Sequence, residues 1–189
     1  MSVVQMKYKS TVTAFLVLVS FSLPLAAQAQ MSARSDALLS DLAQADAAGA
    51  ERLEREIRLE WSKSGSAAMD LLLKRGQDAM EVNDIPKAIN HFTALTDHAP
   101  DFAEGWHGLA LAYFQADRLG LTADALEHTL ALNPRHFGAL RGLGAVFEEL
   151  DQPALAYDAY SRVLEIRPHD TDVEEALKRL ETRVRGTEL

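Results

Sequence analysis

Three prolines, Pro100, Pro134 and Pro168, lie 34 residues apart, and the segments that precede them align residue by residue. A fixed period of about 20–50 residues is typical of proteins built from stacked structural repeats. One such unit cannot bury its apolar side chains alone, so neighbouring units must pack against each other to form a continuous core. The spacing therefore predicts a linear array of similar units.

The pattern within each unit is helical. Leu140, Leu143, Gly144 and Phe147 recur at i, i+3, i+4 and i+7, which places them on one face of a helix. Turn-forming residues interrupt each unit near its middle, so each unit is expected to contain two helices. These turns are expected at Asn83-Asp84, Asp117-Arg118 and Asp151-Gln152-Pro153.

With each proline at the thirty-second position, the units begin at Met69, Ala103 and Phe137. The second unit then follows the tetratricopeptide repeat (TPR) pattern of Trp, Leu, Gly and Tyr, with Ala110 in place of the glycine. The matching residues are, unit by unit, Gly76, Ala88, Phe92 and Pro100; Trp106, Leu109, Tyr113 and Pro134; and Leu143, Gly144, Ala156 and Pro168. Arg75 departs from the pattern, which has leucine there. Residues 69–185 thus resemble the TPR superfamily.

The resemblance implies an all-α fold, a right-handed superhelical solenoid of antiparallel helix pairs. Three TPR repeats occupy residues 67–168, with pattern boundaries at 69–102, 103–136 and 137–170. Residues 30–66 are interpreted as a degenerate, TPR-like helical hairpin that turns at Ala47-Ala48-Gly49 and caps the amino end of the array. Residues 169–189 are expected to form a capping helix and tail at the other end, because such arrays need a polar outer face.

The first 29 residues have the pattern of a secretory signal peptide. Lys7 and Lys9 precede an apolar run from Thr11 to Leu25, and Ala27-Gln28-Ala29 predicts cleavage before Gln30. The alternative is a retained membrane anchor, but the run of about 15 residues is shorter than the ~20 that span a bilayer. We therefore expect a periplasmic protein with no membrane insertion after cleavage.

Composition limits the partners and cofactors. The formal net charge is −9, and removal of Lys7 and Lys9 with the signal peptide makes it −9 − 2 = −11. An acidic surface repels phosphate backbones, so nucleic acid is excluded as an expected partner. The chain has no cysteine. We expect no cofactor, and a monomer or weak homo-oligomer.

No arrangement of residues in the sequence predicts catalysis. The six histidines show no metal-ligand spacing such as H-E-x-x-H, so no metal site is expected. His169-Asp170-x-Asp172 is interpreted as a helix start rich in capping acids. Asp101 and Glu104 have the spacing of a capping box. The protein is therefore expected not to be an enzyme.

In TPR proteins the first helix of each repeat lines a concave groove. Carried onto this chain, the resemblance predicts a peptide-binding surface made of Leu73, Lys74, Gln77, Met80, His107, Leu111, Phe114, Arg141, Ala145 and Glu148. The positions that clamp a terminal carboxylate in some TPR proteins hold Leu73, Gln77, Gly108, Gly138 and Gly142, so that activity is not expected.

Two alternatives remain open for the groove. Phe114 and Met80 belong either to the binding surface or to the core between repeats. Gly108, Gly138 and Gly142 either let a ligand approach the backbone or let neighbouring helices pack more closely, because glycine within a helix costs ~0.5–1 kcal/mol relative to alanine.

The expected function is that of a periplasmic adaptor or scaffold that binds a peptide segment of a partner protein. The stretches Trp61–Ser66 and Pro134–Leu140 resemble small exported TPR proteins of Gram-negative bacteria, which suggests a role in envelope assembly. The alternatives are an assembly chaperone for apocytochrome or another exported protein, and a self-assembling structural protein.

Overall fold

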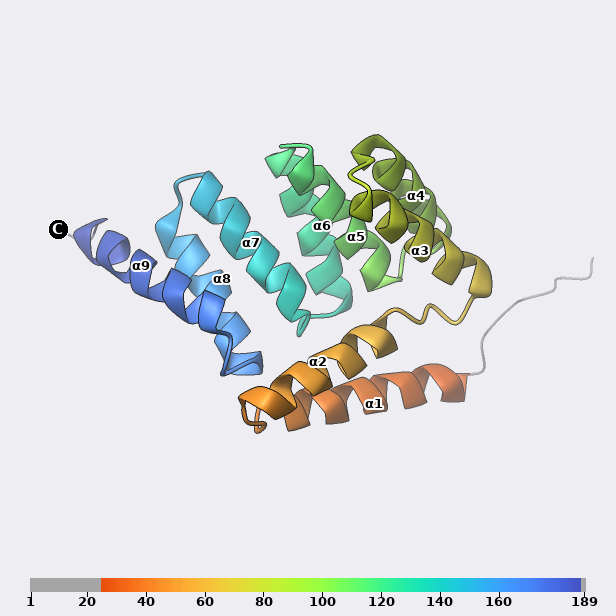
Figure 1. Ribbon diagram of the computed structural model, residues 1–189, viewed down its shortest axis with the longest axis horizontal. Helices are drawn as coiled ribbons and strands as arrows, with labels where there is room; N and C mark the ends of the chain where they lie inside the picture. The colour runs from red at the N-terminus through yellow and green to blue at the C-terminus, as the bar shows by residue number, and fades with distance from the viewer. Residues whose placement is uncertain (1–24, 188–189) are drawn as a thin grey trace, which may run out of the picture.

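The computed structural model describes residues 25–187, which form nine helices and no strand (Figure 1). None of the helices in this range is long and apolar enough to cross a membrane. The helices are α1 (Leu25–Leu42), α2 (Ala47–Trp61), α3 (Ala67–Glu81), α4 (Ile85–His98), α5 (Ala103–Gln115), α6 (Leu119–Leu132), α7 (Phe137–Glu149), α8 (Pro153–Ile166) and α9 (Thr171–Thr187).

Helices α3 to α8 form three antiparallel pairs, and their turns repeat one geometry. Asn83, Asp117 and Asp151 have φ angles of 58°, 56° and 54°, in the left-handed region that short polar side chains tolerate best after glycine. At the first of these turns, the backbone amide of Asp84 donates to the carbonyl oxygen of Ala79 at 2.8 Å. This bond closes the end of α3 as a Schellman motif does.

The helices of a pair approach closely where the repeat has a glycine. A Cβ added at Gly144 would lie 2.5 Å from the Tyr160 ring, and one at Gly76 would overlap the ring of Phe92. The small residue in the first helix therefore makes room for the aromatic residue of the second. This confirms that the patterned glycine serves packing within the pair.

The outer face of the first repeat is polar, and this explains the departure at Arg75. The equivalent position of the second repeat is Leu109, which packs against the preceding repeat and is 5% exposed. Likewise Asp78 corresponds to the fully buried Ala112. Asp78 forms an exposed ion pair with Lys74 at 2.8 Å. The array therefore begins with a helix, α3, whose outer face is suited to water.

Helices α1 and α2 form the N-terminal hairpin, with a turn that differs from the expected one. Ala47-Ala48-Gly49 forms the first turn of α2, and the chain reverses at residues 43–46. The carboxylate of Asp46 accepts from the Gly49 amide at 2.8 Å and so caps the helix. This N-cap outweighs the turn tendency of Gly49, because it satisfies an amide that would otherwise lack a partner.

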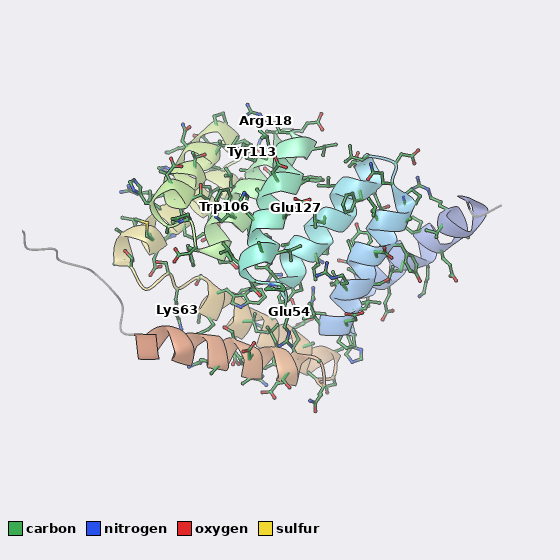
Figure 2. All side chains as sticks on the ribbon, turned by 180° about the vertical axis from the view of Figure 1, so that it is seen from behind. Glu54, Lys63, Trp106, Tyr113, Arg118 and Glu127 are labelled. Carbon is green, nitrogen blue, oxygen red and sulfur yellow. The ribbon has the colours of Figure 1, made fainter. Side chains whose placement is uncertain are left out.

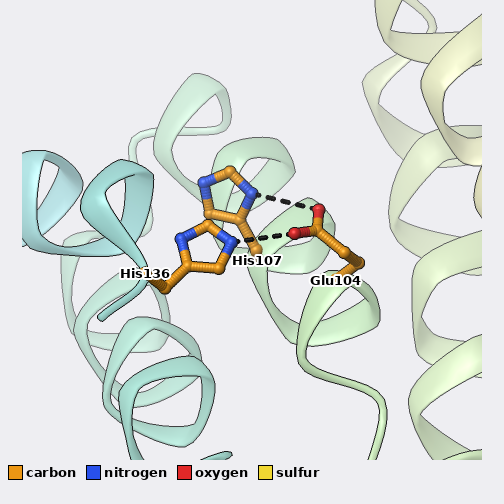
Figure 3. Close-up of side chains that lie close together, drawn as sticks. All are labelled: Glu104, His107 and His136. Atoms are coloured by element: carbon orange, nitrogen blue, oxygen red, sulfur yellow. Dashed lines mark hydrogen bonds and ion pairs between the residues drawn. The ribbon is translucent and has the colours of Figure 1, made fainter. Parts of the chain in front are cut away.

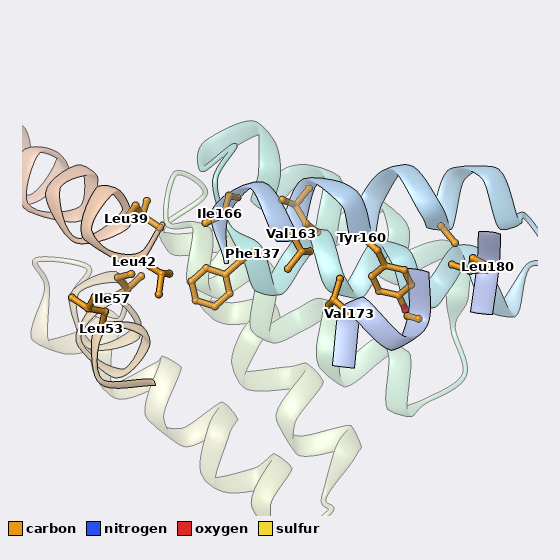
Figure 4. Packing of buried hydrophobic residues seen from close by; sticks show 13 residues of the cluster. Leu39, Leu42, Leu53, Ile57, Phe137, Tyr160, Val163, Ile166, Val173 and Leu180 are labelled. Atoms are coloured by element: carbon orange, nitrogen blue, oxygen red, sulfur yellow. The ribbon is translucent and has the colours of Figure 1, made fainter. Parts of the chain in front are cut away.

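The hairpin also lies in a different place from the one expected. It crosses the array and packs against the third repeat, where Leu42 and Ile57 share a buried cluster with Phe137 and Ile166 (Figures 1 and 4). The hairpin packs there because its apolar side chains need an apolar surface. The outer face of α3 is polar, whereas the start of α7 and the end of α8 present apolar side chains. An ion pair between Arg167 and Glu54 joins the same elements.

Helix α9 covers the carboxyl end of the array. Val173, Ala176 and Leu180 are buried in the cluster that includes residues of α8. The Asp170 carboxylate accepts from the Val173 amide at 3.3 Å, which is the capping role expected for that acidic stretch. Figure 2 shows the opposite face of the molecule, with Trp106 on the second repeat above the hairpin.

The predicted signal peptide lies mostly outside the described residues. Its positively charged start and apolar run fall before Leu25, where the description begins. Helix α1 runs from Leu25 through Ala29 and Gln30, so cleavage at the predicted bond would leave the helix from Gln30 to Leu42.

Candidate peptide-binding groove

A cavity of about 330 Å³ lies between α5 and α7 and is the candidate site. Helix α6 forms its floor, and α2 of the hairpin contributes one side chain to its rim. We call it the groove cavity. Its lining residues are Arg58, His107, Ala110, Leu111, Phe114, Thr122, Leu126, Gly138, Arg141, Gly142 and Ala145.

Five of the ten predicted groove residues meet in this cavity. They are His107, Leu111, Phe114, Arg141 and Ala145. Leu111 and Phe114 are 45% and 37% exposed, although both are large apolar side chains. Phe114 therefore belongs to the groove surface. Met80 packs against the buried cluster of the first repeat, so it belongs to the core and not to the binding surface.

The other predicted groove residues do not line this cavity. Leu73 is 3% exposed and belongs to the core of the first repeat, as does the partly buried Met80. Lys74 is paired with Asp78 on the outer face of α3. Gln77 is exposed on α3 and does not line the cavity. The first repeat thus contributes no side chain to the groove cavity.

Glu148 has a structural role instead. Its carboxylate accepts from the Tyr160 hydroxyl at 3.0 Å and pairs with Arg179 of α9 at 3.0 Å. Burial raises the pKa of Tyr160, and the neighbouring Glu148 carboxylate acts in the same direction. Glu148 therefore ties α9 to the last repeat and is not available to a ligand.

The three groove glycines make room for side chains of the protein itself. A Cβ at Gly108 would overlap the Phe92 ring, and one at Gly142 would lie 3.0 Å from Leu126. At Gly138 the nearest atom would be Nε2 of His107, at 3.1 Å. Close packing between helices explains these glycines, and the proposed approach of a ligand is not needed for them.

Two arginines stand at the rim of the cavity. Arg141 comes from α7, and its nearest carboxylate oxygens, on Asp170 and Asp172, are 3.7 and 3.9 Å away. Arg58 comes from α2, and its guanidinium lies 5.3 Å from the centre of the Phe137 ring. Sequence reasoning missed Arg58, because nothing in its local pattern indicates that the hairpin reaches the groove.

A third arginine, Arg167, also lies close to the Phe137 ring. Arg167 lies 5.1 Å from the same ring centre, and it pairs with Glu54 and, at 2.7 Å, with Asp170. Burial lowers the pKa of Arg58 from its ordinary value, and the nearby cations of Arg167 and Arg141 act in the same direction. Arginine nevertheless stays protonated at neutral pH.

A cluster of the partly buried Glu104 and the buried His107 and His136 lies beside the cavity (Figure 3). The ring Nε2 of His136 is 2.9 Å from one Glu104 oxygen, and Nδ1 of His107 is 3.7 Å from the other. On the hairpin side, Trp61 stacks on the His136 ring with a centroid separation of 4.6 Å. The cluster thus connects the second repeat, the third repeat and the hairpin.

The hydrogen bonds of His136 favour a structural role over a metal site. Glutamate and histidine are zinc ligands, and the ligand atoms of the three residues lie within 4.8 Å of one another. However, Nδ1 of His136 accepts from the Ala139 amide at 3.0 Å. In the neutral ring the proton is therefore on Nε2, which donates to Glu104 and has no lone pair for a metal.

The protonation of this cluster follows from its burial and its hydrogen bonds. Burial opposes ionisation of Glu104, but the nearby His107 ring and the hydrogen bond with His136 outweigh it and hold the pKa of the carboxyl well below its ordinary value. Burial lowers the pKa of His136, although the bond to Glu104 acts in the opposite direction. At neutral pH the pair is a carboxylate that accepts from a neutral imidazole.

This network also overturns the predicted capping box. The N-cap of α5 is Phe102, which makes no side-chain cap, and Glu104 turns toward His136 instead. Only the short Glu104-x-x-His107 spacing was visible locally. The third member lies in the next repeat, so no local pattern indicated the cluster.

The stacked helix pairs and their groove define a helical repeat solenoid, and the comparisons with known proteins identify its family. The tetratricopeptide repeat family matches residues 73–127 and 123–171. A TPR repeat-containing protein of Rhizobium etli is 34% identical over 154 residues, which cover 81% of this chain and 76% of that protein. The chain belongs to the tetratricopeptide repeat family.

Solved structures share the fold at low sequence identity. The first TPR domain of Spaghetti (RPAP3), bound to an HSP90 peptide, has a TM-score of 0.60 at 22% identity, covering 61% of this chain and 92% of that one. The Yersinia enterocolitica type III secretion chaperone SycD, in complex with a peptide of the translocator YopD, has a TM-score of 0.59 at 11% identity, covering 62% and 95%. These are similarities of fold.

Proposed function

We propose that the protein is a periplasmic adaptor that binds a segment of a partner protein in the groove cavity, during assembly of the cell envelope, and that it is not an enzyme. The observation that carries the proposal is the exposure of Leu111 and Phe114 beside one another in a cavity. Large apolar side chains gathered in a concavity favour a site that a partner covers.

The repeat family supports the same function. Structures of this fold have been solved with bound peptides of other proteins. The export of the protein rests on the amino-terminal pattern, so amino-terminal sequencing of the protein from its host tests it. The first residue is expected to be Gln30, and an intact Met1 in a soluble periplasmic extract would contradict export with cleavage.

The binding role is tested with a photo-reactive side chain placed in the cavity. We expect a cross-linker at position 111 to capture one partner in living cells, and Phe114→Ala to abolish that capture. The same cross-linker at Leu121 is the matched control, because that leucine is 44% exposed but lies on α6 outside the cavity. Equal capture at both positions would refute a groove function.

A further inference from the structure

We propose that the groove cavity recognises an acidic side chain next to an apolar side chain in the partner, and that Arg58 of the hairpin binds the carboxylate. This inference rests on the proposed function and specifies the chemistry of the partner. It also makes the hairpin, which lies outside the repeats, a part of the binding site.

The size of the cavity sets what can enter. About 330 Å³ is near the lower end of the ~300–1,000 Å³ typical of ligand pockets. The walls next to Leu111 and Phe114 are apolar and include Ala145 and the buried Leu126. The space suits one or two side chains of an otherwise exposed segment, and the deeper of these should be apolar.

The cations at the rim have unused hydrogen-bonding capacity. Among the residues whose side chains are described, 33–184, no carboxylate lies within ion-pairing distance of Arg58. Its guanidinium lies 5.3 Å from the centre of the Phe137 ring, a contact that uses none of its N–H groups as hydrogen-bond donors to an oxygen. The acidic neighbours of Arg141 are 3.7 and 3.9 Å away, beyond hydrogen-bond distance.

Arg167, which lies beside the same Phe137 ring, is paired with carboxylates and serves as a comparison. It has Asp170 at 2.7 Å and a second carboxylate from Glu54. Arg58 has no such ion pair among the described side chains, and the two ion pairs of Arg141 are longer, although the chain carries a net charge of −9 and acidic side chains are abundant. An unpaired Arg58 beside a loosely paired Arg141 therefore favours an incoming anion, and a guanidinium can bind a carboxylate through two parallel hydrogen bonds.

The charge of the whole chain restricts the kind of anion. A protein with an excess of acidic residues repels polyanions at long range, so an isolated carboxylate beside apolar groups is a better match than a polyphosphate. The site also differs from a clamp built within the repeats. None of the five positions that clamp a terminal carboxylate in some TPR proteins holds a cationic side chain here. These positions hold Leu73, Gln77, Gly108, Gly138 and Gly142.

Three capped peptides of equal length test the assignment, with the sequence Leu-X-Leu in an alanine and serine background and X as glutamate, glutamine or lysine. Fluorescence anisotropy with the purified protein is expected to give the tightest binding for glutamate. Arg58→Gln should weaken the glutamate peptide about tenfold or more, the usual effect of losing a hydrogen bond to a charged group, and leave the glutamine peptide nearly unchanged. Arg58→Glu should reverse the preference toward lysine.

Arg55→Gln is the matched control, because it makes the same change of charge on α2 at an exposed residue that does not line the cavity. Equal affinity for the glutamate and glutamine peptides, equal effects of the two arginine variants, or no binding of any of the peptides would each overturn the acidic specificity. Cross-linking from position 111 decides the proposed function separately, because it does not depend on which side chain the partner inserts.

Discussion

Trp61, at the end of α2, stacks on the ring of His136, the residue that caps α7, with ring planes 23° apart. This contact joins two stretches that are far apart in the sequence, Trp61–Ser66 and Pro134–Leu140. It also packs the hairpin against the residue that hydrogen-bonds Glu104. The hairpin is therefore fixed to the array by aromatic packing on a hydrogen-bonded residue.

Trp61→Ala is expected to destabilise the protein by about 2–3 kcal/mol. Truncation of a fully buried tryptophan costs ~3–5 kcal/mol, and Trp61 is only partly buried. Denaturant unfolding followed by circular dichroism measures the change. Leu59→Ala is the control on the same helix, because Leu59 is 64% exposed and its loss should stay within about 0.5 kcal/mol.

A pair of glycine substitutions should act in opposite directions. Gly144→Ala places a Cβ 2.5 Å from Tyr160, so we expect a loss of about 1–3 kcal/mol from overpacking. Gly120→Ala places its Cβ where no atom lies within 4 Å, so the better helix propensity of alanine should stabilise the protein by up to about 1 kcal/mol. Melting temperatures that change in the same direction would contradict this packing analysis.

Stability should fall as the pH is lowered from 7 to 5. The pKa of His136 in the folded protein is below its ordinary value of 6.5, so the unfolded chain binds the proton first. The stabilisation is fully present above pH 6.5 and is lost as the pH falls toward the lowered pKa. Glu104, whose pKa is also lowered, adds a loss in the same direction below its ordinary value of 4.5.

The variant His136→Asn tests the origin of this pH dependence. Asparagine can still cap α7 but does not titrate, so the free energy of unfolding should vary less between pH 7 and 5 than in the unmodified protein. His98→Asn changes an exposed histidine and should leave the slope unchanged. An unaltered slope in the first variant would assign the effect to other groups.

Removal of α9 should impair folding. A chain ending before Thr171 would expose Tyr160 and Val163, which are now 6% and 0% exposed. We expect a lower melting temperature or aggregation, measured by differential scanning calorimetry and light scattering. Leu180→Ala is the milder variant, with an expected cost of about 2–5 kcal/mol because the side chain is fully buried.

The repeat fold was predictable because its signals are local and periodic. The proline interval, the turn residues and the small residue at Gly76 or Gly144 each act within one helix pair, so one sequence contains three copies of the same evidence. Arg75 carried further information, because an arginine at a core position indicates that its helix has no neighbour on that side. That inference becomes evident once Leu109 is seen buried at the equivalent position.

The position of the hairpin and half of the site depended on contacts between distant residues. Arg58 reaches the cavity only because α2 docks on Phe137, and no periodic pattern encodes that docking. Glu104 meets His136 across a repeat boundary, so its capping-box spacing was misleading. In the groove, Leu73 and Glu148 occupy positions that line the surface in the family pattern but are here used for core packing and for holding α9.

The docking of the hairpin on the third repeat also bears on how the chain unfolds. In an open solenoid each unit contacts only its neighbours, so the ends can fray independently and stability is nearly a sum of local terms. Here Leu42 and Ile57 are buried against Phe137, which lies two repeats further along the chain than the hairpin itself. The first and second repeats therefore lie between two segments that pack against each other. Unfolding of either repeat alone would leave a closed loop, which gains less conformational entropy than a free end, so unfolding should approach a single cooperative transition.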